Sequence, residues 1–330
     1  MKYTYLGRSG MRVSRLCLGT MNFGPNTPEK EAFAIMDKAL EAGINFFDTA
    51  NEYGKHNNGH CGWTEEIIGR WFALGGSRRE KVVLGTKVYA NMKDETDGPN
   101  GTPGLSAYKI RRHIEGSLKR LQTDHVELYQ MHHIDRHANW DEIWGAFEML
   151  VSQGKVYYVG SSNFGARHLI YAQTSAEKRN FFGLINEQHK YNLLCRLPEL
   201  EVLPAARDLG IGITPWSPLF MGLLSGSVLK PVDSIQRSVK YSGKLSDAQV
   251  TQLTAYSELC REVGESESIV ALAWLLANPA VTAPIIGPRT LEQLESSLRA
   301  VEVELSEDVM KKLDAIFPGP GGESPEAYTW

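Results

Sequence analysis

The chain has 330 residues, of which 42% are hydrophobic and 22% are charged, as is typical of globular proteins. Its net charge of -4 provides no basic surface for nucleic acid or an anionic membrane. The apolar runs are too short to span a bilayer, and the N-terminal segment lacks the apolar core of a secretory signal. The 4 cysteines are widely spaced, as in a reduced protein. We therefore expect a globular, cytoplasmic protein.

In chain order, residues 1–14 alternate around a turn at Arg8, Ser9 and Gly10, which predicts a β-hairpin. Apolar, β-branched runs then predict strands at residues 15–20, 45–50, 82–88, 126–133, 156–162, 184–191, 211–217 and 283–287. Amphipathic stretches between them predict helices, among them residues 28–43 and residues 106–121, which open at the N-cap Ser106. Strands joined by helical crossovers pair in parallel, and this unbroken series favours a single (β/α)8 TIM barrel over an open sheet.

Other segments do not fit the minimal strand–helix repeat. Long polar connections at residues 54–63, 89–105 and 219–245 follow strand ends, on the C-terminal face where barrel enzymes build their sites. A helix pair, residues 247–263 and 268–277, precedes the last strand, and the tail at residues 317–330 is expected to be irregular. No linker divides the chain, so we expect one domain spanning residues 1–330.

Reactive residues recur at the ends of three successive predicted strands. GINFFDTANEYG supplies Asp48 and Tyr53, GTKV supplies Lys87, and LYQMHH supplies His132. A lysine beside a tyrosine stabilises the phenolate left after proton donation, and an aspartate keeps that lysine charged despite burial. A histidine can orient a carbonyl oxygen or share the proton. Taken singly, each residue more often caps a strand or packs. Together they suit proton donation to a carbonyl that receives a hydride.

These segments closely resemble the signatures of the aldo-keto reductase family, in a branch that includes bacterial reductases and potassium-channel β subunits. The resemblance extends over almost the whole chain. It implies that Tyr53 is the general acid, that Lys87 and Asp48 tune it, and that His132 orients the carbonyl. His133 would have a structural or rim role.

The same resemblance implies a nicotinamide cofactor. VGSSN, NEQHKYN, TPWSPLFMGLLSG and APIIGPRTLEQLESSL match the family's cofactor segments, with Trp216 in place of the usual tyrosine and Ser297 in place of asparagine. The expected cofactor contacts are Thr20, Ser162, Asn163, Gln188, Trp216, Ser217, Leu219, Gly222, Ser225, Arg237, Gly287, Arg289, Gln293 and Ser297. Arg237 and Arg289 favour NADP(H) through its 2′-phosphate. NAD(H) stays an alternative, because Ser227 stands where many members have lysine or arginine.

The sequence argues against two other kinds of site. A Rossmann dehydrogenase is disfavoured because no GxGxxG follows a strand. A metal site is not expected at His56, His60 and Cys61, which lack a fourth ligand nearby. The sequence thus predicts an NAD(P)H-dependent reductase of sugar-like or small carbonyl substrates. The alternative is a cofactor-bound regulatory or redox-sensing barrel with little turnover. The sequence leaves both a monomer and a homo-oligomer open.

Overall fold

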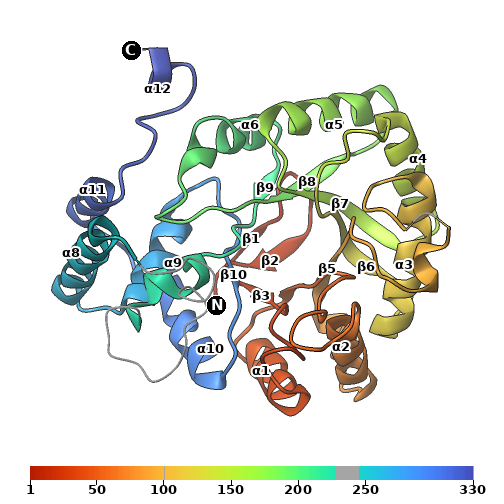
Figure 1. The fold of residues 1–330 in the computed structure, drawn as a ribbon, viewed down its shortest axis with the longest axis horizontal. Coiled ribbons are helices and arrows are strands. Elements are labelled where there is room, and N and C mark those ends of the chain that lie inside the picture. The colour runs from red at the N-terminus through yellow and green to blue at the C-terminus, as the bar shows by residue number, and fades with distance from the viewer. Residues whose placement is uncertain (100, 228–244, 330) are drawn as a thin grey trace.

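The computed structural model describes residues 1–99, 101–227 and 245–329, and a curled sheet of parallel strands forms its centre (Figure 1). The strand order around the sheet is β10 (Ile285–Ile286), β3 (Cys17–Gly19), β4 (Phe46–Asp48), β5 (Val83–Val88), β6 (Val126–Met131), β7 (Val156–Ser162), β8 (Leu184–Gln188) and β9 (Gly212–Ile213). The two edges meet where Ile213 pairs with Val281 and accepts a hydrogen bond from the Thr282 amide. The predicted (β/α)8 TIM barrel is therefore confirmed, and each strand lies within its predicted range.

Helices surround the barrel in Figure 1. They are α1 (Glu29–Glu41), α2 (Trp63–Ala73), α3 (Ala107–Leu121), α4 (Trp140–Ser152), α5 (Ala166–Lys178), α6 (Val202–Asp208), α8 (Asp247–Val263), α9 (Glu267–Ala277), α10 (Leu291–Leu298) and α11 (Glu307–Ile316). The short α12 (Glu326–Thr329) lies away from the barrel, at the end of the C-terminal tail. The predicted N-cap is present, since the Ser106 side chain accepts from the Lys109 amide. The prediction of an irregular tail was wrong at its end, where α12 forms a short helix. No helix in the described ranges is long and apolar enough to cross a membrane.

Alternating side chains divide the apolar core into two parts. Along β4, Phe46 joins a cluster inside the barrel, whereas Phe47 joins the larger cluster between the strands and the helices. This is the period of two that a strand imposes on its side chains. Leu128 of β6 also lies in the inner cluster. The apolar interior therefore fills the lower part of the barrel and leaves the strand ends above it for polar groups.

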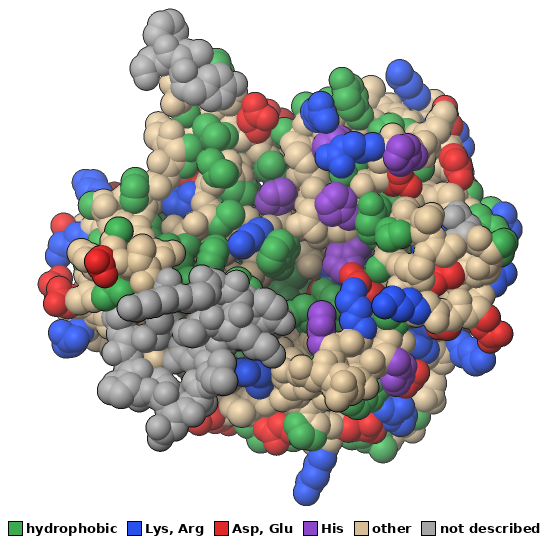
Figure 2. Space-filling view, viewed as in Figure 1, with side chains coloured by type: hydrophobic (Ala, Val, Ile, Leu, Met, Phe, Trp, Pro, Cys, Tyr) green, Lys and Arg blue, Asp and Glu red, His purple; other side chains and the backbone are tan. Residues whose placement is uncertain are grey.

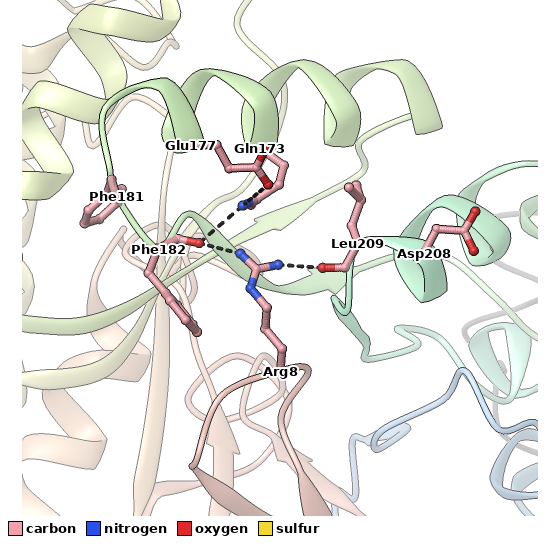
Figure 3. A pocket seen from close by; sticks show the side chains of 7 residues that line it. All are labelled: Arg8, Gln173, Glu177, Phe181, Phe182, Asp208 and Leu209. Atoms are coloured by element: carbon pink, nitrogen blue, oxygen red, sulfur yellow. Dashed lines mark hydrogen bonds between the residues drawn. The ribbon is translucent and has the colours of Figure 1, made fainter.

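The predicted N-terminal hairpin closes the bottom of the barrel. Its strands are β1 (Tyr3–Tyr5) and β2 (Arg12–Ser14), and its buried Leu6 and Val13 pack into the inner cluster. Figure 3 shows the Arg8 guanidinium donating to the carbonyl oxygens of Phe182 and Leu209, which precede β8 and β9. The pocket drawn there thus lies at the N-terminal ends of the strands. The reactive residues that the sequence predicts at strand ends lie on the opposite side of the barrel, at the C-terminal ends of the strands.

Candidate active site

The four residues predicted for proton donation meet at the C-terminal ends of β4, β5 and β6, which are neighbours in the barrel. The Lys87 ammonium lies 2.6 Å from Oδ2 of Asp48 and donates to the Tyr53 hydroxyl at 3.1 Å. It also donates to the Thr49 carbonyl at 2.8 Å. Lys87 is fully buried and Asp48 nearly so, which makes their ion pair a poorly screened one.

Burial and charge act in opposite directions on this cluster. Burial would lower the pKa of the Lys87 ammonium, but Asp48 and Tyr53 outweigh burial and raise that pKa above its ordinary value. Burial raises the pKa of the Tyr53 phenol, and Lys87 opposes that rise. Lys87 is thus charged and Tyr53 protonated at neutral pH. The cluster holds a phenol with its proton in place and a fixed cation beside its oxygen.

A polar layer beneath the site holds Asp48, and the sequence analysis missed most of it. The side-chain amides of Gln130 and Gln188 donate to Oδ1 of Asp48 at 3.1 Å and 2.8 Å. Asn186 in turn donates to Gln130 and to the hydroxyl of Thr214. Alternation along β6 carries a signal for Gln130, because it lies two residues after the inward-facing Leu128 and two before His132.

His132 lies edge-on to Tyr53, with ring centroids 6.0 Å apart and an interplanar angle of 78°. Burial, together with the cations of Lys87 and Lys55 and the neighbouring His133, lowers the pKa of His132 well below its ordinary value. The ring is therefore a neutral imidazole. A carboxylate that the sequence analysis did not single out, Glu52, approaches its Nδ1 to 3.3 Å.

The residues predicted to hold the nicotinamide carboxamide adjoin this cluster. Asn163 donates to the His132 carbonyl at 3.1 Å and to the Ser162 hydroxyl at 3.0 Å, and it accepts from the Trp216 indole at 3.2 Å. The Ser162 hydroxyl donates to the Gln188 carbonyl. Asn163 has a φ of 61°, a left-handed conformation that asparagine tolerates better than most residues. The side chain of Asn163 thus connects Trp216 to the backbone of His132.

The segment after Trp216 turns sharply into a short 3-10 helix, Phe220–Ser225. Ser217, Met221 and Gly222 have positive φ angles of 55°, 56° and 101°. The backbone amides of Phe220, Gly222 and Leu224 donate to the carbonyls of Ser217 and Leu219, and the Met221 amide donates to the Ser217 hydroxyl. Leu219 and Ser225 lie in the same turn, where the Ser225 hydroxyl donates to the Gly222 carbonyl. That Ser217, Leu219, Gly222 and Ser225 line the path of the cofactor's pyrophosphate stays a prediction.

The remaining predicted cofactor residues lie at two other strand ends. Thr20 follows β3, and its hydroxyl donates to the Asp48 carbonyl. Gly287 follows β10, and its carbonyl accepts from the Asn22 amide at 2.8 Å. Arg289 and Gln293 join the loop to α10, since the Arg289 amide donates to the Gln293 side chain. The Ser297 hydroxyl donates to the Gln293 carbonyl. Arg237 lies outside the described residues.

A buried polar chain supports the loop that carries Tyr53. Asn51 donates to Nδ1 of His113 on α3 at 2.9 Å, and Nε2 of His113 lies 3.2 Å from Asp97. Burial, with some help from Lys109, lowers the pKa of His113 to about 4. Asp97 also accepts from the backbone amides of Met92 and Lys93. This chain connects the long loop after β5 to the Tyr53 loop.

Figure 2 shows histidine side chains gathered around a hollow in the face that carries the C-terminal ends of the strands.

The residues considered as metal ligands have other partners. His60 contacts Glu66 and stacks on Trp63, whereas Cys61 approaches the Asn91 carbonyl. Within the described ranges, no three His, Cys, Asp or Glu side chains group closely enough to hold a metal ion.

Comparisons with known proteins agree with the barrel fold. The sequence model described as "Aldo/keto reductase family" matches residues 15–317. The chain is similar to "Uncharacterized oxidoreductase YrpG" of Bacillus subtilis (strain 168), with 63% identity over all of both chains. It is 34% identical to a "Probable voltage-gated potassium channel subunit beta" of Oryza sativa subsp. japonica, over 96% of both chains. "Protein tas" of Escherichia coli (strain K12) is 31% identical over 97% of this chain and all of its own.

Members of the matched family generally use nicotinamide cofactors and act on small carbonyl substrates. Asp48, Tyr53, Lys87 and His132 lie together at the end of the barrel where barrel enzymes build their sites. The fold, the match over residues 15–317 and the similarity to these relatives show that the chain belongs to the aldo/keto reductase family.

Proposed function

We propose that this protein reduces the carbonyl group of an aldehyde or ketone to the alcohol, with NADPH as its preferred cofactor and Tyr53 as the general acid. The contact that carries the proposal is the Lys87 ammonium, held between Asp48 and the Tyr53 hydroxyl in a buried site. A buried cation is costly to maintain unless it is paired. The expected substrates are sugar-like or small carbonyl compounds, reached through the hollow of Figure 2.

Tyr53 is arranged to give up a proton. Its oxygen accepts from Lys87, and its own proton has no acceptor among the described residues. A carbonyl oxygen placed there receives that proton, and the phenolate left behind is stabilised by the ammonium 3.1 Å away. Asp48 holds the ammonium in place through their 2.6 Å contact. Proton donation thus comes from the loop after β4, and the stabilisation of its product from Lys87 on the neighbouring β5.

The residues around the cluster fit a nicotinamide cofactor. Oε1 of Gln188 is not buried and accepts no hydrogen bond within the described ranges, so it can accept from a carboxamide. Trp216 offers an aromatic face whose position Asn163 fixes. The exposed Arg289 guanidinium has no ion pair in the described part of the chain and suits a 2′-phosphate. When bound, the cofactor supplies the hydride to the carbonyl carbon.

A second candidate function rests on the relatives. The similarity to proteins named as potassium channel β subunits, in Oryza sativa and Arabidopsis thaliana, favours a cofactor-bound regulatory or redox-sensing barrel with little turnover. We place the reductase first because the proton-donating cluster is complete. We expect it to act in the cytoplasm, since all four cysteines are free in the structure.

Turnover separates the two candidates. The purified full-length protein is incubated with NADPH or NADH and a panel of aldehydes and ketones, and cofactor oxidation is followed by absorbance. We expect many turnovers per protein and a lower KM for NADPH. Arg289→Gln should raise the KM for NADPH by about tenfold and change that for NADH little, because one charge-assisted contact is lost. Arg299→Gln, a change of an exposed arginine paired with Glu265, is the matched control. Tight NADPH binding without oxidation would favour the regulatory barrel.

A further inference from the structure

The loops that follow β6 and β7 each carry an arginine without a carboxylate partner. Arg136 lies in the loop after β6, and Arg167 lies in the first turn of α5, after β7. Both are exposed, and neither has an ion pair among the described residues. The two strands are neighbours in the barrel. At the other end of α5, by contrast, Arg179 pairs with Glu148 and Asp141. Figure 2 shows Lys, Arg and His side chains gathered on the side of the hollow towards α5.

The carboxylates of the same region are bonded to other groups. Asp135, in the loop after β6, accepts from three backbone amides at 2.8, 2.8 and 3.3 Å. Glu187 on β8 is fully buried and accepts from the Ser161 hydroxyl and the Phe164 amide, with Nδ1 of His189 2.9 Å away. The two guanidinium groups therefore keep most of their N–H donors for a ligand.

A hydrogen-bond acceptor is missing where α5 begins. The Gly165 amide donates to Nδ1 of His168 at 3.3 Å, and Nε of Arg167 lies 3.4 Å from Nε2 of the same ring. Burial lowers the pKa of His168, and the guanidinium groups of Arg167 and Arg136 lower it further, so the ring is neutral at pH 7. A neutral imidazole has one nitrogen lone pair and accepts from only one of these donors at a time. One donor at this point therefore lacks an acceptor, and Arg136 is close enough to act on the same ring.

These groups lie beside the proposed reaction centre and apart from the expected anions of the cofactor. Arg136 follows His132 by four residues, and Arg167 follows Asn163 by four. Asn163 in turn donates to the His132 carbonyl. The pyrophosphate and the 2′-phosphate of the cofactor are expected at the loops after β9 and β10, and neither strand is a neighbour of β6 or β7. The two arginines are therefore available to a substrate.

We propose that Arg136 and Arg167 bind an anionic group, a phosphate or a carboxylate, on the carbonyl substrate. The inference rests on the proposed function, and it narrows the expected sugar-like or small carbonyl compounds to those that carry such a group. Guanidinium groups suit these anions because their paired N–H donors match two oxygens at once. An oxygen of the anion also supplies the acceptor that the donors around His168 lack.

Two pairs of aldehydes, each differing in the anionic group, test the substrate class. They are glycolaldehyde phosphate with glycolaldehyde, and succinic semialdehyde with butanal. At low ionic strength we expect the wild-type kcat/KM, corrected for hydrated aldehyde, to be about 100-fold higher for the anionic member of at least one pair, because two charge-assisted contacts are gained. The pair with the larger ratio identifies phosphate or carboxylate. Added salt should lower the ratio.

Substitution of the arginines tests whether they cause the preference. Arg136→Gln and Arg167→Gln should each lower the ratio about tenfold, and the double variant should bring it near one. Both side chains are exposed, so these variants are expected to fold. Lys178→Gln removes an exposed cation at the far end of α5 and should keep the wild-type ratio. A wild-type ratio near one for both pairs, or a full preference in the double variant, would overturn the inference.

Binding without turnover separates this inference from the proposed function. Calorimetric titration measures the Kd of glycolaldehyde phosphate and of succinic semialdehyde for the full-length protein saturated with NADP⁺, which has no hydride to transfer. We expect the Kd of the preferred aldehyde to rise about tenfold in each single variant, and the Kd of NADP⁺ to stay at its wild-type value. Weaker binding of NADP⁺ with unchanged binding of the aldehyde would assign the arginines to the cofactor and overturn the inference. If the wild type reduced no carbonyl compound at all, the proposed function would fail, and the titration alone would decide whether Arg136 and Arg167 hold an anion.

Discussion

At the scale of single residues, both the proposed proton donation and the stability of the barrel depend on the buried Lys87–Asp48 ion pair. Each partner needs the other, because a lone charge inside a barrel lacks both water and a counter-ion. Gln130 and Gln188 hold the second oxygen of Asp48, so its carboxylate is bonded on both sides. The contacts that hold Lys87 beside the proposed proton donor therefore also compensate for the burial of two charges.

A double-mutant cycle measures this dependence. Lys87→Met should lower the free energy of unfolding by about 3 kcal/mol, because it leaves the Asp48 charge buried and unpaired. Adding Asp48→Leu should recover much of that loss. Denaturant unfolding of the two single variants and the double variant gives the coupling. Strictly additive losses would contradict the pairing.

At the scale of elements, the loop that carries Tyr53 is supported from α3. His113 accepts from Asn51, two residues before Tyr53, and it is neutral because burial lowers its pKa to about 4. The unfolded chain binds a proton at this histidine near pH 6.5, whereas the folded protein does not until about pH 4. Folding therefore competes with protonation between these two values.

Stability should respond to pH in that window. As pH falls from 6.5 to 4, the His113 contribution should decrease by up to about 3 kcal/mol, because the unfolded state gains the proton first. Urea titrations at several pH values give the slope. His113→Gln should make the slope smaller, leaving the part that the buried His132 contributes, and His137→Gln, which changes an exposed histidine, should not change the slope. An unchanged slope in His113→Gln would assign the acid response to other groups.

The N-terminal hairpin is the other element whose role can be measured. Leu6 is fully buried in the inner cluster, while its neighbour Tyr5 is 57% exposed. Leu6→Ala should therefore lower the free energy of unfolding by about 3 kcal/mol, and Tyr5→Ala by well under 1 kcal/mol. Equal effects in denaturant melts would mean that the hairpin does not plug the barrel.

At the scale of the whole molecule, the sequence predicted the architecture because its signals were strong and repeated. Eight apolar runs joined by helical crossovers favour parallel pairing in a closed barrel. Ser106 marks the start of a helix because its side chain can cap the first turn. The end of the tail was harder to predict, because α12 has only 4 residues and is too short to show a helical period in its sequence.

Within the site, the sequence predicted residues at strand ends and missed those that depend on register. Asn186 supports Asp48 through Gln130, yet its neighbour Ile185 lies in the inner cluster too. Pairing with β7 shifts by one residue there, so the alternation of β8 changes phase. Glu52 was missed for a different reason. Its contact with His132 joins a loop to another strand, which spacing alone does not specify.

Cofactor binding should stabilise the whole barrel, because the predicted contacts come from loops after many different strands. At a concentration about 100 times Kd, NADPH should add about 2.7 kcal/mol to the free energy of unfolding. Thermal melts with NADPH and with NADH at equal concentration check this, and the larger rise in Tm should come from NADPH. Equal or absent shifts would contradict the cofactor preference.

The most direct test of the central claim compares chemistry with binding in Tyr53→Phe. This change removes the proton donor and keeps the ring, so kcat should fall by about 100-fold or more while the Kd for NADPH changes less than about twofold. Tyr171→Phe, on the exposed face of α5, should match the wild type in both. A Tyr53→Phe variant that turned over at the wild-type rate would show that the proton comes from elsewhere.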